Sequence, residues 1–204
     1  MLTDVAEYYD ARLSEHGETP RGVDWNGYES QLTRFLQLTK IIGCDQIFSL
    51  NDLGCGYGAL LDVLIPRYPG LSYYGYDVSR EMIESAKVRN SRLENASFSV
   101  GSEPDQMADY GIASGIFNVK MDYPDNEWLS YILHTLDTLN STSNKGFSFN
   151  CLTLYSDSHM MRDHLYYADP RAIFDFCIRN YSRNVALLHD YGLFEFTVLV
   201  KKST

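Results

Sequence analysis

The segment spanning residues 47–65 constrains this 204-residue chain more than any other. Residues 47–53, IFSLNDL, read as a buried strand, and residues 59–65 have helical apolar spacing. Between them, three glycines alternate with larger residues in the sequence GCGYG. Such glycines let the backbone pass close to a ligand, and the amides at the start of the helix can point at its polar groups. The segment therefore predicts a strand–turn–helix unit that binds a nucleotide-like cofactor.

Two classes of cofactor use a turn of this kind. The sequence GCGYGA satisfies the G-x-G-x-x-G/A dinucleotide pattern, in which the start of the helix faces a pyrophosphate. With an acid two residues before the first glycine, the run more closely resembles motif I of class I S-adenosylmethionine-dependent methyltransferases. In that family the turn cradles the methionine part and the ribose of a cofactor that has no phosphate. The resemblance implies that the cofactor contacts Asp52, Gly54, Cys55, Gly56 and Gly58.

A second strand, 72–77, ends in Asp77, and Ser79 can cap the helix expected at 79–90. An acid about 20 residues beyond the glycine turn is placed to accept hydrogen bonds from both ribose hydroxyls. The residues from Tyr76 to Ala86 resemble motif II of the same methyltransferases, in which an apolar side chain after the acid packs on adenine. The resemblance implies that Asp77, Val78 and Ser79 contact the cofactor, with Val78 at the adenine.

Two later strand ends complete the expected cofactor site. The third strand ends at Gly101 and Ser102, where the family pattern commonly has an aspartate that meets the adenine amino group; here a serine hydroxyl or a backbone group could serve. The fourth ends in ASGIFN, which corresponds to motif IV beside the transferred methyl. We expect Ser114 to touch the cofactor, and Asn118 either to touch substrate or to form an ordinary turn. The Asp/Asn-Pro-Pro-aromatic tetrad of nucleobase-methylating enzymes is absent from this segment.

The composition excludes several classes of partner. A formal charge of −10 and a pI near 4.8 argue against nucleic acids and anionic membranes, which clustered Lys and Arg would bind. The N-terminal sequence has no basic and apolar signal, and no run of 18 apolar residues could span a bilayer, so we expect a cytoplasmic protein. The four cysteines lack CxxC spacing, which favours reduced thiols and no metal site.

Strands and helices alternate along the rest of the chain, which predicts a doubly wound α/β fold in one domain, 1–204. Two N-terminal helices within residues 1–43 are expected to form a helical lid, and Thr3 caps the first of them. The second also packs on the sheet of the core, which comprises residues 44–204. The last two strands are joined by only three residues, 190–192, so they form an antiparallel hairpin. A mostly parallel sheet with this ending resembles the seven-stranded, Rossmann-like methyltransferase fold. The predicted helices are 59–68, 79–90, 126–140 and 170–179; the predicted strands are 47–53, 72–77, 97–100, 110–114, 146–154, 185–189 and 193–200.

Candidate catalytic and substrate residues lie outside these motifs. His189, next to Asp190 at the end of a strand, could act as a general base or could simply bond the backbone of a hairpin. The polar and aromatic segment 155–169 could form a substrate wall with Tyr155 and His164; its two histidines are five apart, unlike a metal-binding pair. Three further candidates from the N-terminal region could close over the cofactor or could pack on the sheet. These are Tyr9, His16 and Trp25.

These features together predict an S-adenosylmethionine-dependent methyltransferase that acts on a small molecule, with the methylated atom unassigned. Two alternatives stay open at this point. One is a nicotinamide-dependent oxidoreductase that uses the same glycine turn. The other is a catalytically degenerate methyltransferase-like subunit that only binds a partner. The sequence does not indicate an oligomeric state.

Overall fold

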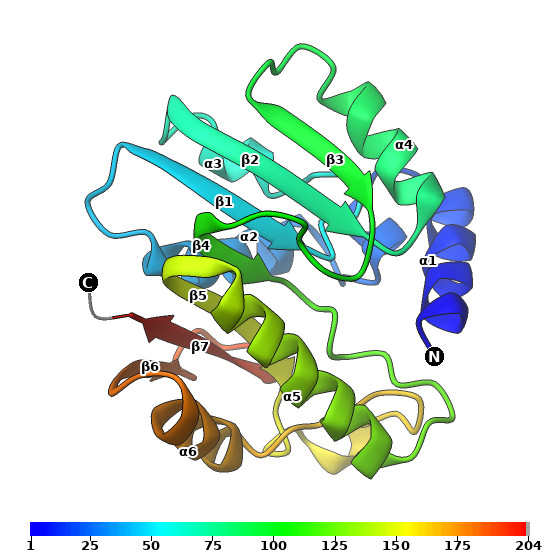
Figure 1. The fold of residues 1–204 in the computed structure, drawn as a ribbon. Helices are drawn as coiled ribbons and strands as arrows, with labels where there is room; N and C mark the ends of the chain where they lie inside the picture. The colour runs from blue at the N-terminus through cyan, green and yellow to red at the C-terminus, as the bar shows by residue number, and fades with distance from the viewer. Residues whose placement is uncertain (203–204) are drawn as a thin grey trace.

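A computed structural model describes residues 1–202, which form a single seven-stranded sheet in the order β3-β2-β1-β4-β5-β7-β6 (Figure 1). β7 is antiparallel to both of its neighbours, and the remaining pairings are parallel, which confirms the predicted sheet and its C-terminal hairpin. The carboxyl ends of the other six strands therefore meet at one edge. The strands are β1 (Ile47–Leu53), β2 (Gly70–Asp77), β3 (Ala96–Val100), β4 (Ala108–Ala113), β5 (Ser143–Leu152), β6 (Asn184–Leu188) and β7 (Glu195–Lys201).

Six α-helices and three short 3-10 helices connect and cover these strands. The α-helices are α1 (Leu2–His16), α2 (Tyr28–Leu38), α3 (Leu61–Leu64), α4 (Arg80–Arg89), α5 (Asp125–Ser141) and α6 (Pro170–Asn180). The 3-10 helices are η1 (Pro20–Val23), η2 (Thr39–Ile41) and η3 (Ser158–Met160). No helix within residues 1–202 is long and apolar enough to cross a membrane.

Helix ends agree with the sequence in one case and differ from it in two. Ser79 caps α4 as predicted, because its hydroxyl accepts a hydrogen bond of 2.9 Å from the amide of Met82. The predicted cap at Thr3 is wrong: α1 begins at Leu2, so Thr3 lies inside its first turn. The helix predicted at 59–68 is only the single turn of α3, and Pro66, which cannot continue a helix, follows it closely.

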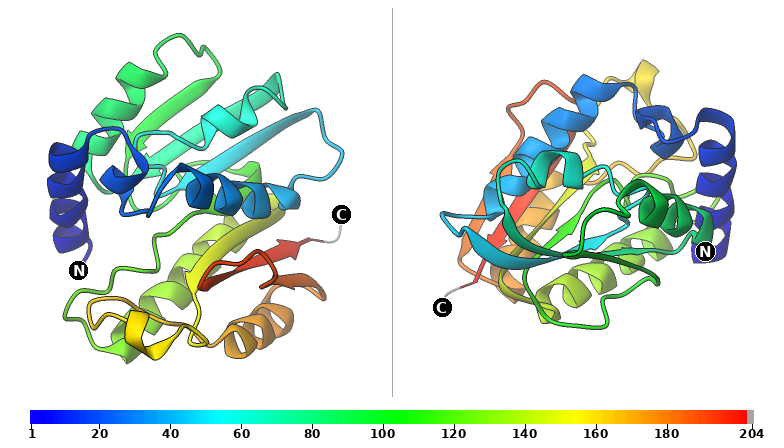
Figure 2. Two further views of the ribbon diagram at one scale, coloured as in Figure 1. Left: turned by 180° about the vertical axis from the view of Figure 1, so that it is seen from behind. Right: turned by 90° about the horizontal axis from the view of Figure 1, so that it is seen from above.

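Two apolar cores lie on opposite faces of the sheet. Side chains of α2, α3 and α4, among them Phe35, Leu64 and Met82, pack on one face, and those of α5 and α6, among them Trp128 and Cys177, pack on the other. Figure 2 shows α2 along the face opposite α5 and α6. The link between β3 and β4, residues 101–107, contains no helix in the described chain.

The strands β5 and β7 bury a row of polar side chains. Six of their apolar side chains belong to the core beneath α5 and α6: Phe147, Phe149, Cys151, Phe196, Val198 and Val200. Four residues that alternate with them are polar and at most 1 % exposed: Ser148, Asn150, Glu195 and Thr197. Because the hydroxyl of Ser148 donates to the carbonyl of Leu38 at 2.9 Å, this polar side faces α2. Helix α2 thus rests on a face that needs hydrogen-bonding partners.

The N-terminal helices sit differently on this frame. α2 is embedded in the first core through Phe35 and Leu38, as predicted. α1 stands beside α4 at the edge where β2 and β3 end (Figures 1 and 2), and Val5 is its buried side chain. Side-chain contacts tie its ends to the rest of the molecule, including a hydrogen bond from Tyr123 to Asp4. The segment between the two helices crosses the carboxyl ends of β1 and β4, where the site lies.

Candidate functional site

A pocket opens at the carboxyl ends of β1, β2, β3 and β4 and is roofed by the N-terminal segment; together with its open mouth it encloses about 900 Å³. Its position is the one expected for ligands of open α/β sheets. Residues from the glycine turn, from the ends of these four strands and from α4 form its floor. These floor residues are Asp52, Leu53, Gly54, Cys55, Gly56, Tyr57, Ala59, Leu60, Asp77, Val78, Met82, Gly101, Ser102, Ser114, Gly115 and Ile116. The remaining lining residues are Leu2, Val5, Tyr9, Val23, Trp25, Gln31, Phe35 and Tyr131.

The first two glycines of the turn cannot carry side chains. Gly54 and Gly56 have φ values of 75° and 53°, which other residues adopt only with strain. A Cβ on Gly54 would overlap Ile116, and one on Gly56 would lie 3.2 Å from Cγ1 of Val23. The backbone of the turn is therefore the surface that the pocket presents, with Ile116 and Val23 closing on it.

Asp77 is held by the turn and by the start of α4. Its Oδ2 accepts a hydrogen bond of 2.9 Å from the amide of Gly56, and its Oδ1 accepts one of 2.9 Å from the amide of Ser79. Burial raises the pKa of Asp77 to about 6, opposed by these amide hydrogen bonds. The group is ionised at neutral pH, and each oxygen retains a lone pair. It can therefore accept two further hydrogen bonds, which is what a vicinal diol offers.

Asp52 lies under the glycine turn and is only 2 % exposed. Its Oδ2 accepts a hydrogen bond of 2.5 Å from the hydroxyl of Tyr73. Burial raises the pKa of Asp52 to about 7, although this hydrogen bond acts in the opposite direction. Asp52 thus exchanges its proton close to neutral pH at the floor of the pocket.

Ser114 follows β4 and faces the pocket with an unsatisfied group. Its Oγ is buried and has no hydrogen-bond partner among residues 1–202. A buried hydroxyl of this kind calls for a partner from outside the protein, either a ligand or an ordered water. The bare backbone of the turn, the prepared carboxylate of Asp77 and this hydroxyl fit a ligand that combines a ribose with other polar groups.

The structure brings most of the predicted cofactor residues to this pocket, together with Tyr9 and Trp25 of the N-terminal region. Gly58 and Ser79 stand outside its lining. A Cβ on Gly58 would lie 2.7 Å from Nδ2 of Asn90, so this glycine permits close packing against α4. The Ser79 hydroxyl caps α4 and hydrogen-bonds to Asp10 of α1. Both residues support the turn from behind.

Five predicted residues do not reach the pocket: His16, Asn118, Tyr155, His164 and His189. His189 is exposed at the end of β6, which β5 and β7 separate from β4, and its ring stacks beside Phe196 with centroids 6.4 Å apart. Asn118 is buried and accepts a hydrogen bond of 3.2 Å from the amide of Leu152, so it joins two segments of the frame. His16 is half-buried, whereas Tyr155 and His164 are exposed.

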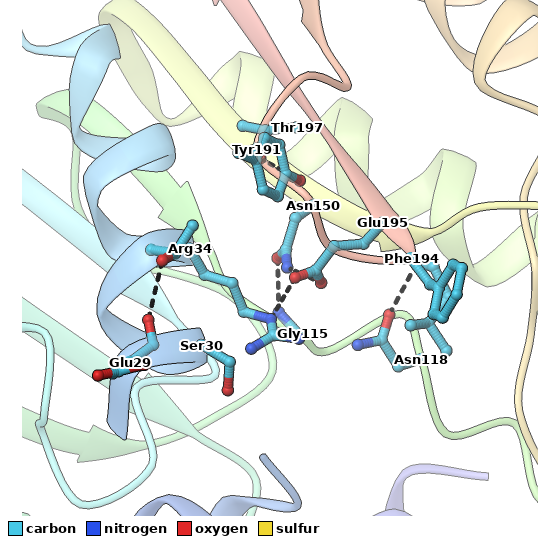
Figure 3. A network of polar contacts seen from close by, with 12 residues as sticks. Glu29, Ser30, Arg34, Gly115, Asn118, Asn150, Tyr191, Phe194, Glu195 and Thr197 are labelled. Carbon is cyan, nitrogen blue, oxygen red and sulfur yellow. Dashed lines mark hydrogen bonds and ion pairs between the residues drawn. The ribbon is translucent and has the colours of Figure 1, made fainter. Parts of the chain in front are cut away.

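A buried polar network that the sequence analysis missed lies behind the pocket (Figure 3). Arg34 of α2 forms an ion pair with Glu195 of β7. Asn150 donates a hydrogen bond of 2.8 Å to Oε2 of Glu195, and the Oδ1 of Asn150 accepts one of 2.8 Å from the amide of Gly115. Alternating polar residues in the apolar strands β5 and β7 were the signal that could have revealed this network.

Trp25 closes this network into a ring of contacts. The Cζ of Arg34 lies 3.9 Å from the centroid of the Trp25 ring, a cation–π distance. The other end of the indole packs on Gly115, because a Cβ there would overlap it. The end of β4, the strands β5 and β7, and α2 are therefore joined through one wall of the pocket.

The ionisable groups of the pocket are acids, tyrosines and a cysteine. Among the described residues no lysine, arginine or histidine lines it. Burial raises the pKa of Tyr131 to about 12 and that of Tyr9 further, so both hydroxyls stay protonated at neutral pH. Within residues 1–202, no three His, Cys, Asp or Glu side chains group as a metal site would need.

Comparison with known proteins agrees with this geometry. Residues 51–146 match a family model described as a methyltransferase domain. The methyltransferase-named protein Rv1506c of Mycobacterium tuberculosis is 56% identical over 165 residues, which cover 81% of this chain and 99% of that protein.

Two solved structures share the fold. Magnesium protoporphyrin IX methyltransferase of Synechocystis, crystallised with S-adenosylhomocysteine (SAH), has a TM-score of 0.69 at 14% identity and covers 98% of this chain and 99% of its own. Human N-acetylserotonin methyltransferase, crystallised with S-adenosylmethionine, has a TM-score of 0.65 and is 18% identical to this chain. The match covers 97% of this chain and 59% of the human chain. At these identities the likeness concerns the fold alone.

Proposed function

Because this chain belongs to the family of S-adenosylmethionine-dependent methyltransferases, we propose that it methylates a small molecule bound beneath its N-terminal segment. One observation carries the proposal: a single pocket joins the glycine turn and Asp77 to Tyr9 and Trp25 of that segment. The polar groups at the strand ends suit a nucleoside cofactor, and the aromatic side chains of the N-terminal segment offer a wall for a compact substrate beside it. Membership of this family leaves the nicotinamide-dependent alternative without support.

We assign the cofactor contacts by the chemistry of each group. Asp77 accepts hydrogen bonds from the two ribose hydroxyls, and Val78 with Met82 offers an apolar surface to the adenine. The backbone at Gly54, Cys55 and Gly56 receives the methionine part. Gly101, Ser102, Ser114 and Asp52 supply the remaining polar contacts from the floor of the pocket. The cofactor, when bound, supplies an electrophilic methyl group on a sulfonium.

The protein's own part in the transfer is to align the acceptor and to exclude water. Val23 covers the glycine turn at Gly56, and Trp25 covers the end of β4 at Gly115. No histidine can act as a base here, since the pocket lining in the described chain contains no histidine. The tyrosine hydroxyls stay protonated at neutral pH, so they are not bases there. Asp52, whose pKa burial raises to about 7, is the lining group whose pKa suits a general base.

Calorimetry and thermal unfolding with SAH test the proposal. We expect one SAH to bind per chain and to raise the melting temperature, because a ligand that binds only the folded state stabilises it. NADH serves as the control ligand and should cause no shift. A screen of methyl transfer to small carboxylates, phosphonates, phenols and amines would then identify the acceptor class. Absence of SAH binding at millimolar concentration would refute the proposed function.

A further inference from the structure

Arg34 is buried with much of its hydrogen-bonding capacity unused. The residue is 6 % exposed, and its Nε faces Glu195. Its Nη1 is buried and has no hydrogen-bond partner among residues 1–202. A guanidinium carries five N–H donors and stays protonated, so a buried one normally has several acceptors around it. The unpartnered nitrogen is therefore an anomaly that the protein alone does not resolve.

The surroundings fix Arg34 but give its Nη1 no hydrogen-bond partner within the described chain. Glu195 is itself held by Asn150, whose side chain donates to Oε2 at 2.8 Å. The guanidinium rests on the ring of Trp25, with Cζ at 3.9 Å from its centroid. A planar guanidinium oriented in this way is suited to receive two oxygens of one anionic group.

Arg34 lies directly behind one wall of the pocket. Gln31, three residues before it and on the same face of α2, lines the pocket, and so does the adjacent Phe35. Trp25 and Gly115 of the contact ring line it too.

The lining residues within 1–202 include no lysine, arginine or histidine. Two arginines lie against aromatic lining residues: Arg34 on Trp25, and Arg89 at 5.4 Å from the ring centroid of Tyr57. Arg89 is partly exposed and already paired with Glu18 and Asp62, whereas Arg34 is buried and keeps a nitrogen that is unpartnered among the described residues.

We propose that the Nη edge of Arg34 is a subsite for an anionic oxygen group, a carboxylate or a phosphonate, of the methyl-accepting substrate. The inference rests on the proposed function and deepens it by naming the substrate class. A bound anion would pair the unused donors of Arg34, while Glu195 keeps the guanidinium in place through Nε.

Calorimetry on SAH-loaded protein tests the subsite with benzoate and phenylphosphonate as anionic probes and benzamide as the neutral probe. We expect both anions to bind at least about tenfold more tightly than benzamide. The double variant Arg34→Met/Glu195→Gln removes both charges and avoids leaving either one buried alone. This variant should bind the two anionic probes at least about tenfold more weakly than the wild type and should bind SAH with an affinity within about threefold of the wild type. Arg171→Met, an exposed arginine on α6, is the matched control and should change neither affinity.

The single variant Glu195→Gln should change the anion affinity in the opposite direction. It keeps the cation and removes its internal counter-charge, so anion affinity should rise. Equal binding of benzoate and benzamide, or unchanged anion affinity in the double variant, would overturn the subsite. It would also be overturned if the double variant weakened SAH but not 5′-methylthioadenosine, because the anion would then be the cofactor's own carboxylate. Wild-type protein that fails to bind SAH would instead contradict the proposed function, before any anion is added.

Discussion

Asp77→Asn is the substitution that tests the cofactor site most directly. In the structure the carboxylate accepts one backbone hydrogen bond of 2.9 Å at each oxygen, from Gly56 and from Ser79. Asparagine keeps the shape but places an NH₂ group opposite one of these amide donors and removes the charge. A hydrogen bond to a charged group contributes about 1.5–3 kcal/mol. We therefore expect SAH to bind about 10- to 150-fold more weakly.

The assay is isothermal titration of SAH at a pH well above the pKa of Asp77, with the melting temperature recorded for each variant. Asp62→Asn is the control, since Asp62 pairs with Arg89 at 2.7 Å on the exposed surface of α3. Such surface pairs contribute about 0–1 kcal/mol to stability, and this one lies outside the pocket lining. If folded Asp77→Asn binds SAH within threefold of the wild-type affinity, Asp77 is not the ribose acceptor.

Three further outcomes follow from the structure. Burial raises the pKa of Asp77 to about 6, so SAH affinity should fall as the pH drops below this value and should level off above it; titrations in buffers of different ionisation enthalpy should show proton release on binding near pH 6. Gly54→Ala should cost about 2–4 kcal/mol in urea unfolding through its positive φ and its overlap with Ile116, and Ile116→Ala in the same chain should recover the overlap part; the absence of such coupling would contradict the packing argument. His189→Ala should keep turnover within about threefold, because the ring lies outside the pocket lining, whereas a fall of about 100-fold with intact SAH affinity would restore it as the base.

Local chemistry explains what could be predicted from the sequence. A backbone that must approach a ligand needs glycine at fixed positions, and an acid at the end of the next strand falls at a fixed distance beyond them. These constraints act within about thirty residues, so the pattern at Gly54, Gly56 and Asp77 indicated the pocket floor without any long-range information. The short link between β6 and β7 likewise fixed the antiparallel hairpin.

Long-range partners could not be predicted in the same way. Arg34 lies in an amphipathic helix and Glu195 at the start of the last strand, and only the folded sheet brings them together. The rule that ligands bind at the carboxyl ends of parallel strands correctly placed His189 at the same edge of the sheet as the pocket. How far His189 lies from the pocket along that edge depends on the strand order, which puts β6 last, beyond β7. The predicted helix at 59–68 relied on apolar spacing, although Pro66 interrupts its hydrogen bonding.

The unequal anchoring of the two N-terminal helices has a consequence for hydrogen exchange. α2 buries Gln31, Arg34, Phe35 and Leu38, so releasing it would expose core and break an ion pair. α1 fully buries only Val5 among its described residues; Tyr9 and Leu13 pack on the cores but are only partly buried, and side-chain contacts at the surface hold the rest. Local opening costs least where few apolar contacts are lost, so the amides of α1 should exchange faster than those of α2. Ligand traffic would then proceed through repeated detachment of α1, at a rate set by its anchoring contacts and not by the global unfolding of the domain.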